Sequence, residues 1–197
     1  MIPIQKGGRV MKDFFNTANQ NPIIAALNHV DKLDKVIQSP CKIVFLLTGN
    51  ILNLGFIVDS LKKKDKLVYI HIDLIDGFSK DDIAVKFIYE HIGLDGIITT
   101  KANLIKAAKE LHIFTIQRLF ILDSLALDSG INSIKNTKPN AVEILPGIMP
   151  KIVKNVIAET RIPVITGGLI KEKEDVILSL KAGAIAISTS NEEVWYM

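Results

Sequence analysis

The chain has 197 residues, of which 48% are hydrophobic and 23% are charged, and its net charge is +3. This length suits one well-buried domain and is short for two. No apolar run approaches the roughly 18 residues that span a bilayer, and the start MIPIQKGGRV lacks the apolar core of a secretory signal. The single cysteine, Cys41, excludes an internal disulfide framework and a multi-cysteine zinc site, and favours a cytoplasmic location.

Short apolar runs recur along the chain and predict buried strands. Parallel strands are almost continuously apolar because both of their faces are covered. The predicted strands are 23–27, 43–47, 67–73, 96–99, 113–118, 141–145, 163–166 and 184–189.

Amphipathic stretches separate many of these strands and predict helices. The helical segments are 51–64, 80–92, 101–111, 147–159 and 172–182, with a last short helix from 191 to about 195. Residues 1–20 are expected to form a leader that is frayed or makes a short lid, and Met11 is an alternative start. Residues 21–197 are predicted to form the folded domain.

A unit of one strand followed by one helix therefore repeats along the chain. Eight parallel strands are the number that closes a TIM-type (β/α)8 barrel. The sequence therefore predicts a compact, single-domain α/β barrel with short loops. An open, doubly wound sheet is the alternative.

The last two predicted strands are followed by loops suited to an anion. Gly167 and Gly168 follow one strand and allow close approach to backbone N–H groups. Ser188, Thr189 and Ser190 end the other strand with hydroxyl donors. These two loops form the usual phosphate site of this fold. The alternative is that the glycines make only a turn and the hydroxyls only a helix cap.

Polar residues interrupt several apolar strands at their carboxyl ends. They are His71, Asp73, Gln117, Arg118 and Glu143. Because an unpaired buried charge is costly, these groups are expected either to contact a small polyol ligand or to form an internal network. No pair of His or Cys residues has metal-ligand spacing, so no metal site is predicted.

The lysine-rich segment 62-KKKDK-66 is interpreted as a solvated helix end, with RNA contact as the alternative. Of these residues, Lys62, Lys63, Lys64 and Lys66 are the first candidates for such a contact. No known RNA-binding signature is present.

Several segments resemble the glycerol-3-phosphate-responsive antiterminators of low-GC Gram-positive bacteria, the GlpP group. The resemblance runs from about Asn21 to Trp195. Its specific segments are 69-YIHIDLIDG-77, 95-DGIITTKANLI-105, 114-FTIQRLFILDS-124, 141-AVEILPGIMP-150, 163-PVITGGLIKEKEDV-176 and 182-AGAIAISTSNEEVW-195.

This resemblance implies a cytoplasmic transcription regulator rather than an enzyme. It implies glycerol 3-phosphate as the ligand, no other cofactor, and the leader mRNA of a glycerol-catabolic operon as the partner. The phosphate is expected at the glycine and hydroxyl loops, and the glycerol part near Asp73, Arg118 and Glu143. No membrane contact is expected, and a homo-oligomer is compatible with the sequence.

Two other classes of function stay open at this point. One is a phosphate-binding barrel enzyme, an isomerase, aldolase or phosphodiesterase, in which His71, Asp73 and Glu143 do acid–base work. The other is a metabolite-binding protein that acts through a protein partner. The fold alone does not choose among them.

Overall fold

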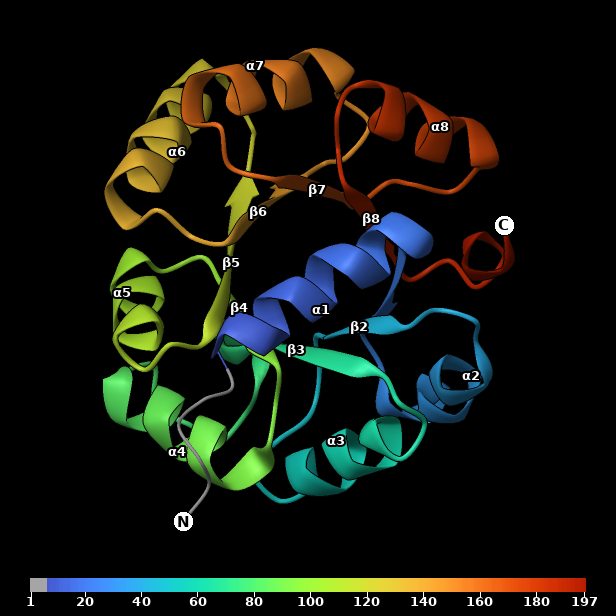
Figure 1. Ribbon diagram of the computed structural model, residues 1–197, viewed down its shortest axis with the longest axis vertical. Coiled ribbons are helices and arrows are strands. Elements are labelled where there is room, and N and C mark those ends of the chain that lie inside the picture. The colour runs from blue at the N-terminus through green and yellow to red at the C-terminus, as the bar shows by residue number, and fades with distance from the viewer. Residues whose placement is uncertain (1–6) are drawn as a thin grey trace.

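Eight parallel strands close into a barrel in the order β1 to β8, with helices around the outside (Figure 1). The computed structural model describes the chain from residue 7 to residue 197, with side chains from residue 13. The strands are β1 (Ile23–Leu27), β2 (Ile43–Leu46), β3 (Leu67–His71), β4 (Gly96–Thr99), β5 (Phe114–Phe120), β6 (Ala141–Leu145), β7 (Val164–Gly167) and β8 (Ala186–Thr189). The predicted TIM-type barrel is confirmed.

Helices connect successive strands and cover the outer face of the barrel. They are α2 (Leu33–Gln38), α3 (Leu54–Lys62), α4 (Asp82–Ile92), α5 (Ala102–Glu110), α6 (Ser124–Thr137), α7 (Pro150–Thr160) and α8 (Lys173–Lys181). Short 3-10 turns lie at Val30–Lys32, Ile72–Leu74 and Val194–Tyr196. No helix of the described chain is long and apolar enough to cross a membrane.

Two of the helices that connect strands, α2 and α6, were not predicted from the sequence. The α6 segment includes Gly130, where an added Cβ would lie 2.9 Å from a side-chain carbon of Leu119 on β5. The glycine weakens the helical pattern, yet it allows the helix to approach the strand closely. Close packing against the barrel therefore favours a helix that the local sequence signals only weakly.

Side chains alternate between the barrel interior and the helical layer. Phe45, Tyr69, Ile98 and Ile116 belong to a buried cluster inside the barrel. Their neighbours in the strands, such as Ile70, pack toward the surrounding helices in a second cluster. This alternation follows from the two-residue period of a strand, and it decides which polar side chains face the interior.

Residues 7–20 of the predicted leader form a helix instead of a frayed end. Residues 1–6 lie outside the described chain, but Gly7–Gln20 form the helix α1, within which Met11 lies. Phe14 is fully buried, with its ring 5.1 Å from that of Tyr69 and 4.8 Å from that of Phe114. Because Phe114 begins β5, α1 covers the amino-terminal end of the barrel, as Figure 1 shows.

Replacing Phe14 by alanine should remove apolar packing at the amino-terminal end of the barrel. We expect Phe14→Ala to lower the free energy of unfolding by about 3–5 kcal/mol, because it leaves a cavity against three aromatic rings. The control is Phe56→Ala, since Phe56 is 70% exposed and should change stability by less than about 0.5 kcal/mol. Denaturant unfolding of both variants makes the comparison, and equal losses would contradict this role of α1.

Candidate functional site

A cavity of about 350 Å³ opens at the carboxyl ends of the strands, opposite α1. Carboxyl strand ends are where barrels of this class place their functional groups. The lining residues are Ala26, Asn28, Leu47, Arg118, Glu143, Leu145, Gly168, Leu169, Ile170, Lys171, Ser188, Thr189, Ser190 and Asn191. The cavity therefore brings together the two predicted phosphate loops and two of the predicted polar residues.

The two loops that follow β7 and β8 are joined by side-chain hydrogen bonds. Thr189 Oγ1 donates to the carbonyl of Ile170 at 3.0 Å, and Asn191 Nδ2 donates to the carbonyl of Lys171 at 3.1 Å. Gly168 has a φ of +72°, which a β-branched residue resists. Of the predicted phosphate residues, Gly168, Ser188, Thr189 and Ser190 line the cavity.

Gly167 is required for a different reason from its neighbour. A Cβ at Gly167 would lie 2.7 Å from Oε1 of Glu143, so the carboxylate occupies the space that a side chain would need. The predicted glycine pair thus combines one residue that permits a left-handed turn with one that makes room for a buried acid.

Arg118 and Glu143 form a buried ion pair at the base of the cavity. The Arg118 Nε donates to Glu143 Oε2 at 2.6 Å, with side chains 6% and 1% exposed. The two residues face each other across β5 and β6. This ion pair is part of the internal network that the sequence predicted as one alternative. Both residues also line the cavity, so their charged groups are accessible to a ligand there.

His71 and Asp73 lie beside this pair rather than in the cavity lining. The Asp73 Oδ2 accepts hydrogen bonds from Thr99 Oγ1 and the Thr100 N–H, both at 2.9 Å. Its other oxygen, Oδ1, and the Nδ1 of His71 are buried without a hydrogen-bond partner in the described chain. Burial first, and then the Arg118 cation, lower the pKa of His71 to about 4, against the opposing effect of Asp73.

Gln117 does not belong to the site, and the prediction for this residue is wrong. Its Nε2 donates to Ser133 Oγ and its Oε1 accepts from Thr137 Oγ1, each at 2.7 Å. Both partners are in α6. Because adjacent strand residues point to opposite faces, the inward position of Arg118 turns Gln117 outward toward the helices.

Other residues of the cavity, notably Asn28 and Lys171, were not predicted from the sequence. Asn28 follows β1, and its Oδ1 is buried without a hydrogen-bond partner among the described residues. A signal existed, since Asn28 comes one residue after an apolar strand. Lys171 brings a cation to the phosphate loops. Within residues 7–197, no group of three or more His, Cys, Asp or Glu side chains could hold a metal ion.

The sequence model of one protein family, the glycerol-3-phosphate responsive antiterminators, matches residues 23–195. The chain belongs to this family. The family is one of regulatory antiterminators, and this agrees with the sequence-based interpretation of a regulator rather than an enzyme.

Individual relatives support the same assignment. The chain is 39% identical over 176 residues to the Escherichia coli protein YgcP, a match that covers 89% of this chain and 92% of that protein. It is 36% identical to the glycerol uptake operon antiterminator regulatory protein of Listeria monocytogenes, with a TM-score of 0.86 over 89% of this chain and 95% of that chain. An antiterminator-related protein of Thermotoga maritima is also 36% identical, with a TM-score of 0.80 over 89% of this chain and 98% of that chain.

Barrel enzymes share the fold at much lower identity. The deoxyribose phosphate aldolase of Aeropyrum pernix is 14% identical, with a TM-score of 0.64 over 96% of this chain and 93% of that chain. A likeness at this level concerns the architecture alone.

The buried His71 predicts a specific dependence of stability on pH. The folded protein holds His71 neutral until about pH 4, whereas an unfolded histidine takes up a proton near pH 6.5. The unfolded state therefore binds more protons between these values, and stability falls as the pH falls. We expect wild type to lose roughly 2–3 kcal/mol more than His71→Asn between pH 7 and pH 4, measured by denaturant unfolding. Identical losses in the two proteins would assign the acid sensitivity to other groups.

Proposed function

We propose that the protein binds glycerol 3-phosphate in the cavity at the barrel mouth and, with this ligand bound, acts on the leader mRNA of a glycerol-catabolic operon. In this proposal it allows transcription past a terminator. Membership in a family of glycerol-3-phosphate responsive antiterminators supports this assignment. We expect it to act in the cytoplasm, where nascent transcripts are found, and a homo-oligomer stays a prediction.

The observation that carries the ligand proposal is the composition of the cavity. One side is made by the loops after β7 and β8, where the backbone N–H groups of Leu169 and Ser190 donate to no group of the described chain. Such loops offer backbone donors and hydroxyls to a phosphate. Lys171 adds a cation on the same side.

The base of the cavity suits the glycerol part of the ligand. The Arg118–Glu143 pair presents charged groups, and Asn28 presents an unpartnered amide oxygen that can accept a hydrogen bond from a hydroxyl. Ala26 and Leu47 supply apolar contact for a carbon chain. A volume of about 350 Å³ is at the small end of ligand pockets, as a ligand of about ten non-hydrogen atoms requires.

Ligand binding should depend on the phosphate and on Lys171. At about 100 times its dissociation constant, glycerol 3-phosphate should stabilise the protein by roughly 2.7 kcal/mol in thermal unfolding, whereas glycerol should stabilise it far less. Lys171→Ala should weaken binding of glycerol 3-phosphate by about tenfold or more in calorimetric titration, because a charge-assisted hydrogen bond to the phosphate is removed.

The matched control for this measurement is Lys173→Ala. Lys173 begins α8, is exposed and does not line the cavity. Lys173→Ala therefore removes the same charge as Lys171→Ala, but outside the proposed phosphate site. The Lys173→Ala variant should bind glycerol 3-phosphate with the affinity of wild type. Equal stabilisation by glycerol and glycerol 3-phosphate, or equal effects of the two lysine variants, would contradict a phosphate site at this loop.

RNA binding and ligand binding should be linked. If glycerol 3-phosphate tightens binding of the leader RNA by some factor, thermodynamic linkage requires the RNA to tighten ligand binding by the same factor. Filter binding with and without ligand measures the first effect, and calorimetry with and without RNA measures the second. If the ligand binds while no RNA binds under any condition, the direct regulator proposal fails and a protein partner replaces RNA.

A further inference from the structure

The two ends of the barrel carry opposite charge. In the connections at the carboxyl ends of the strands, acidic residues outnumber basic ones. The acids are Asp31, Asp73, Asp76, Asp81, Asp123, Glu172, Glu192 and Glu193, and the cations are Lys32, Lys80, Lys101 and Lys171. The mouth that surrounds the ligand cavity is therefore acidic overall.

The connections at the amino ends of the strands have the opposite balance. The exposed cations there are Lys42, Lys63, Lys64, Lys138, Arg161 and, at the end of α8, Lys181. The acids of these connections are Asp65 and Asp95, with Glu110 at the end of α5, and Asp95 is paired with Lys62. None of the six exposed cations forms an ion pair within the described part of the chain.

Other lysines near this end are already engaged. Lys66 is buried, and its Nζ donates to the carbonyls of Ser39 and Cys41 at 3.0 and 2.7 Å. Lys62 is bonded to Asp95. Of the four lysines that the sequence offered for RNA contact, only Lys63 and Lys64 are therefore free to meet a partner.

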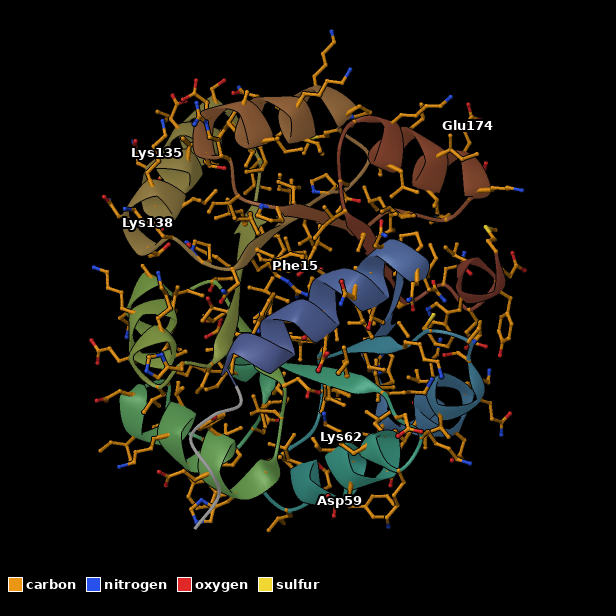
Figure 2. The ribbon with its side chains drawn as sticks, in the orientation of Figure 1. Phe15, Asp59, Lys62, Lys135, Lys138 and Glu174 are labelled. Atoms are coloured by element: carbon orange, nitrogen blue, oxygen red, sulfur yellow. The ribbon has the colours of Figure 1, made fainter. Side chains whose placement is uncertain are left out.

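The free cations form two groups on opposite sides of the barrel. The first group, Lys42, Lys63 and Lys64, precedes the adjacent strands β2 and β3, and the second group, Lys138, Arg161 and Lys181, precedes β6, β7 and β8. The helix α1 lies between them across the amino end (Figure 1). Figure 2 shows the labelled Lys62 and Lys138 on opposite sides of this helix.

We propose that this amino-terminal end, with its two groups of free cations, binds the phosphate backbone of the RNA. The inference rests on the proposed function, because it locates the RNA partner of that function. Lysines in water make sequence-independent contacts with phosphates through charge and release of counterions. Helix C-termini also favour cations, which explains part of the arrangement. That preference does not explain why the connections at this end hold two acids, Asp65 and Asp95, where those at the carboxyl end hold eight.

The carboxyl end is unsuited to the same partner. Its acidic connections repel phosphates, so the aromatic side chains that are exposed there, such as Phe120 at the end of β5, lie in an unfavourable field for RNA. RNA at the amino end leaves the ligand mouth open, so both partners bind at once, as positive linkage requires.

The test compares charge reversal at the two ends. Lys63→Glu/Lys64→Glu and Lys138→Glu/Lys181→Glu alter the two groups. Lys101→Glu/Lys151→Glu makes the same change in charge at exposed positions of the carboxyl end, just before α5 and in the first turn of α7. Each protein is titrated with leader RNA at several salt concentrations. Glycerol 3-phosphate affinity and circular dichroism melting check that each variant is folded.

Each amino-end variant should bind RNA at least about tenfold more weakly. Its salt slope should fall by roughly 0.7 for each phosphate that the substituted lysines bind in wild type. The carboxyl-end variant should bind RNA like wild type, and ligand affinity should be unchanged in all three. The proposal is overturned if the carboxyl-end variant is weakened as much as the others, or if the amino-end variants bind RNA like wild type. Failure of wild type to bind RNA is a different result, since it would count against the proposed function itself.

Discussion

The alternation of side chains along a closed barrel is the constraint on which the site depends. Each strand has one set of residues inside and one set against the helices, and closure leaves no edge at which a strand could shift. Arg118 and Gln117 are neighbours in sequence, yet Arg118 lines the cavity at the barrel mouth and Gln117 is hydrogen-bonded to α6. A polar residue in a barrel strand is therefore functional or structural according to its position in this alternation.

The buried Arg118–Glu143 pair joins β5 and β6, and it also restricts which residue β7 can carry beside it. Two desolvated charges are stable only when they are close and well bonded, and the 2.6 Å contact between β5 and β6 meets that condition. The carboxylate then fills the space beside Gly167 on β7, which excludes any side chain there. Glycine is thus required at position 167 by the ion pair, whereas its neighbour Gly168 lines the cavity.

The fold could be predicted because each strand is a short apolar run, and a parallel barrel needs little else. That the loops after β7 and β8 lie together at one cavity could be predicted because these strands are neighbours in a closed barrel, whereas phosphate binding by these loops stays a prediction. Because neighbouring strand residues face opposite sides, Gln117 faces the helices once Arg118 is assigned to the barrel interior. The sequence alone does not show which of the two residues faces inward. Residues such as Phe14 gave no comparable signal, since the pairing of α1 with Tyr69 and Phe114 joins segments far apart in sequence.

The acidic mouth does not prevent an anion from entering the cavity. Among the residues that line it, the one acid is Glu143, and its charge is offset by Arg118 at 2.6 Å. The nearby segment 166–171 contains no acid and ends in Lys171. Apart from Asp73, which lies beside the ion pair, the acids lie farther out, at positions such as Asp81 and Asp123, which cap helices α4 and α6 by accepting hydrogen bonds from backbone N–H groups. A small phosphate ester therefore meets a locally favourable field at short range, whereas an extended polyanion laid across the same mouth meets the surrounding acids.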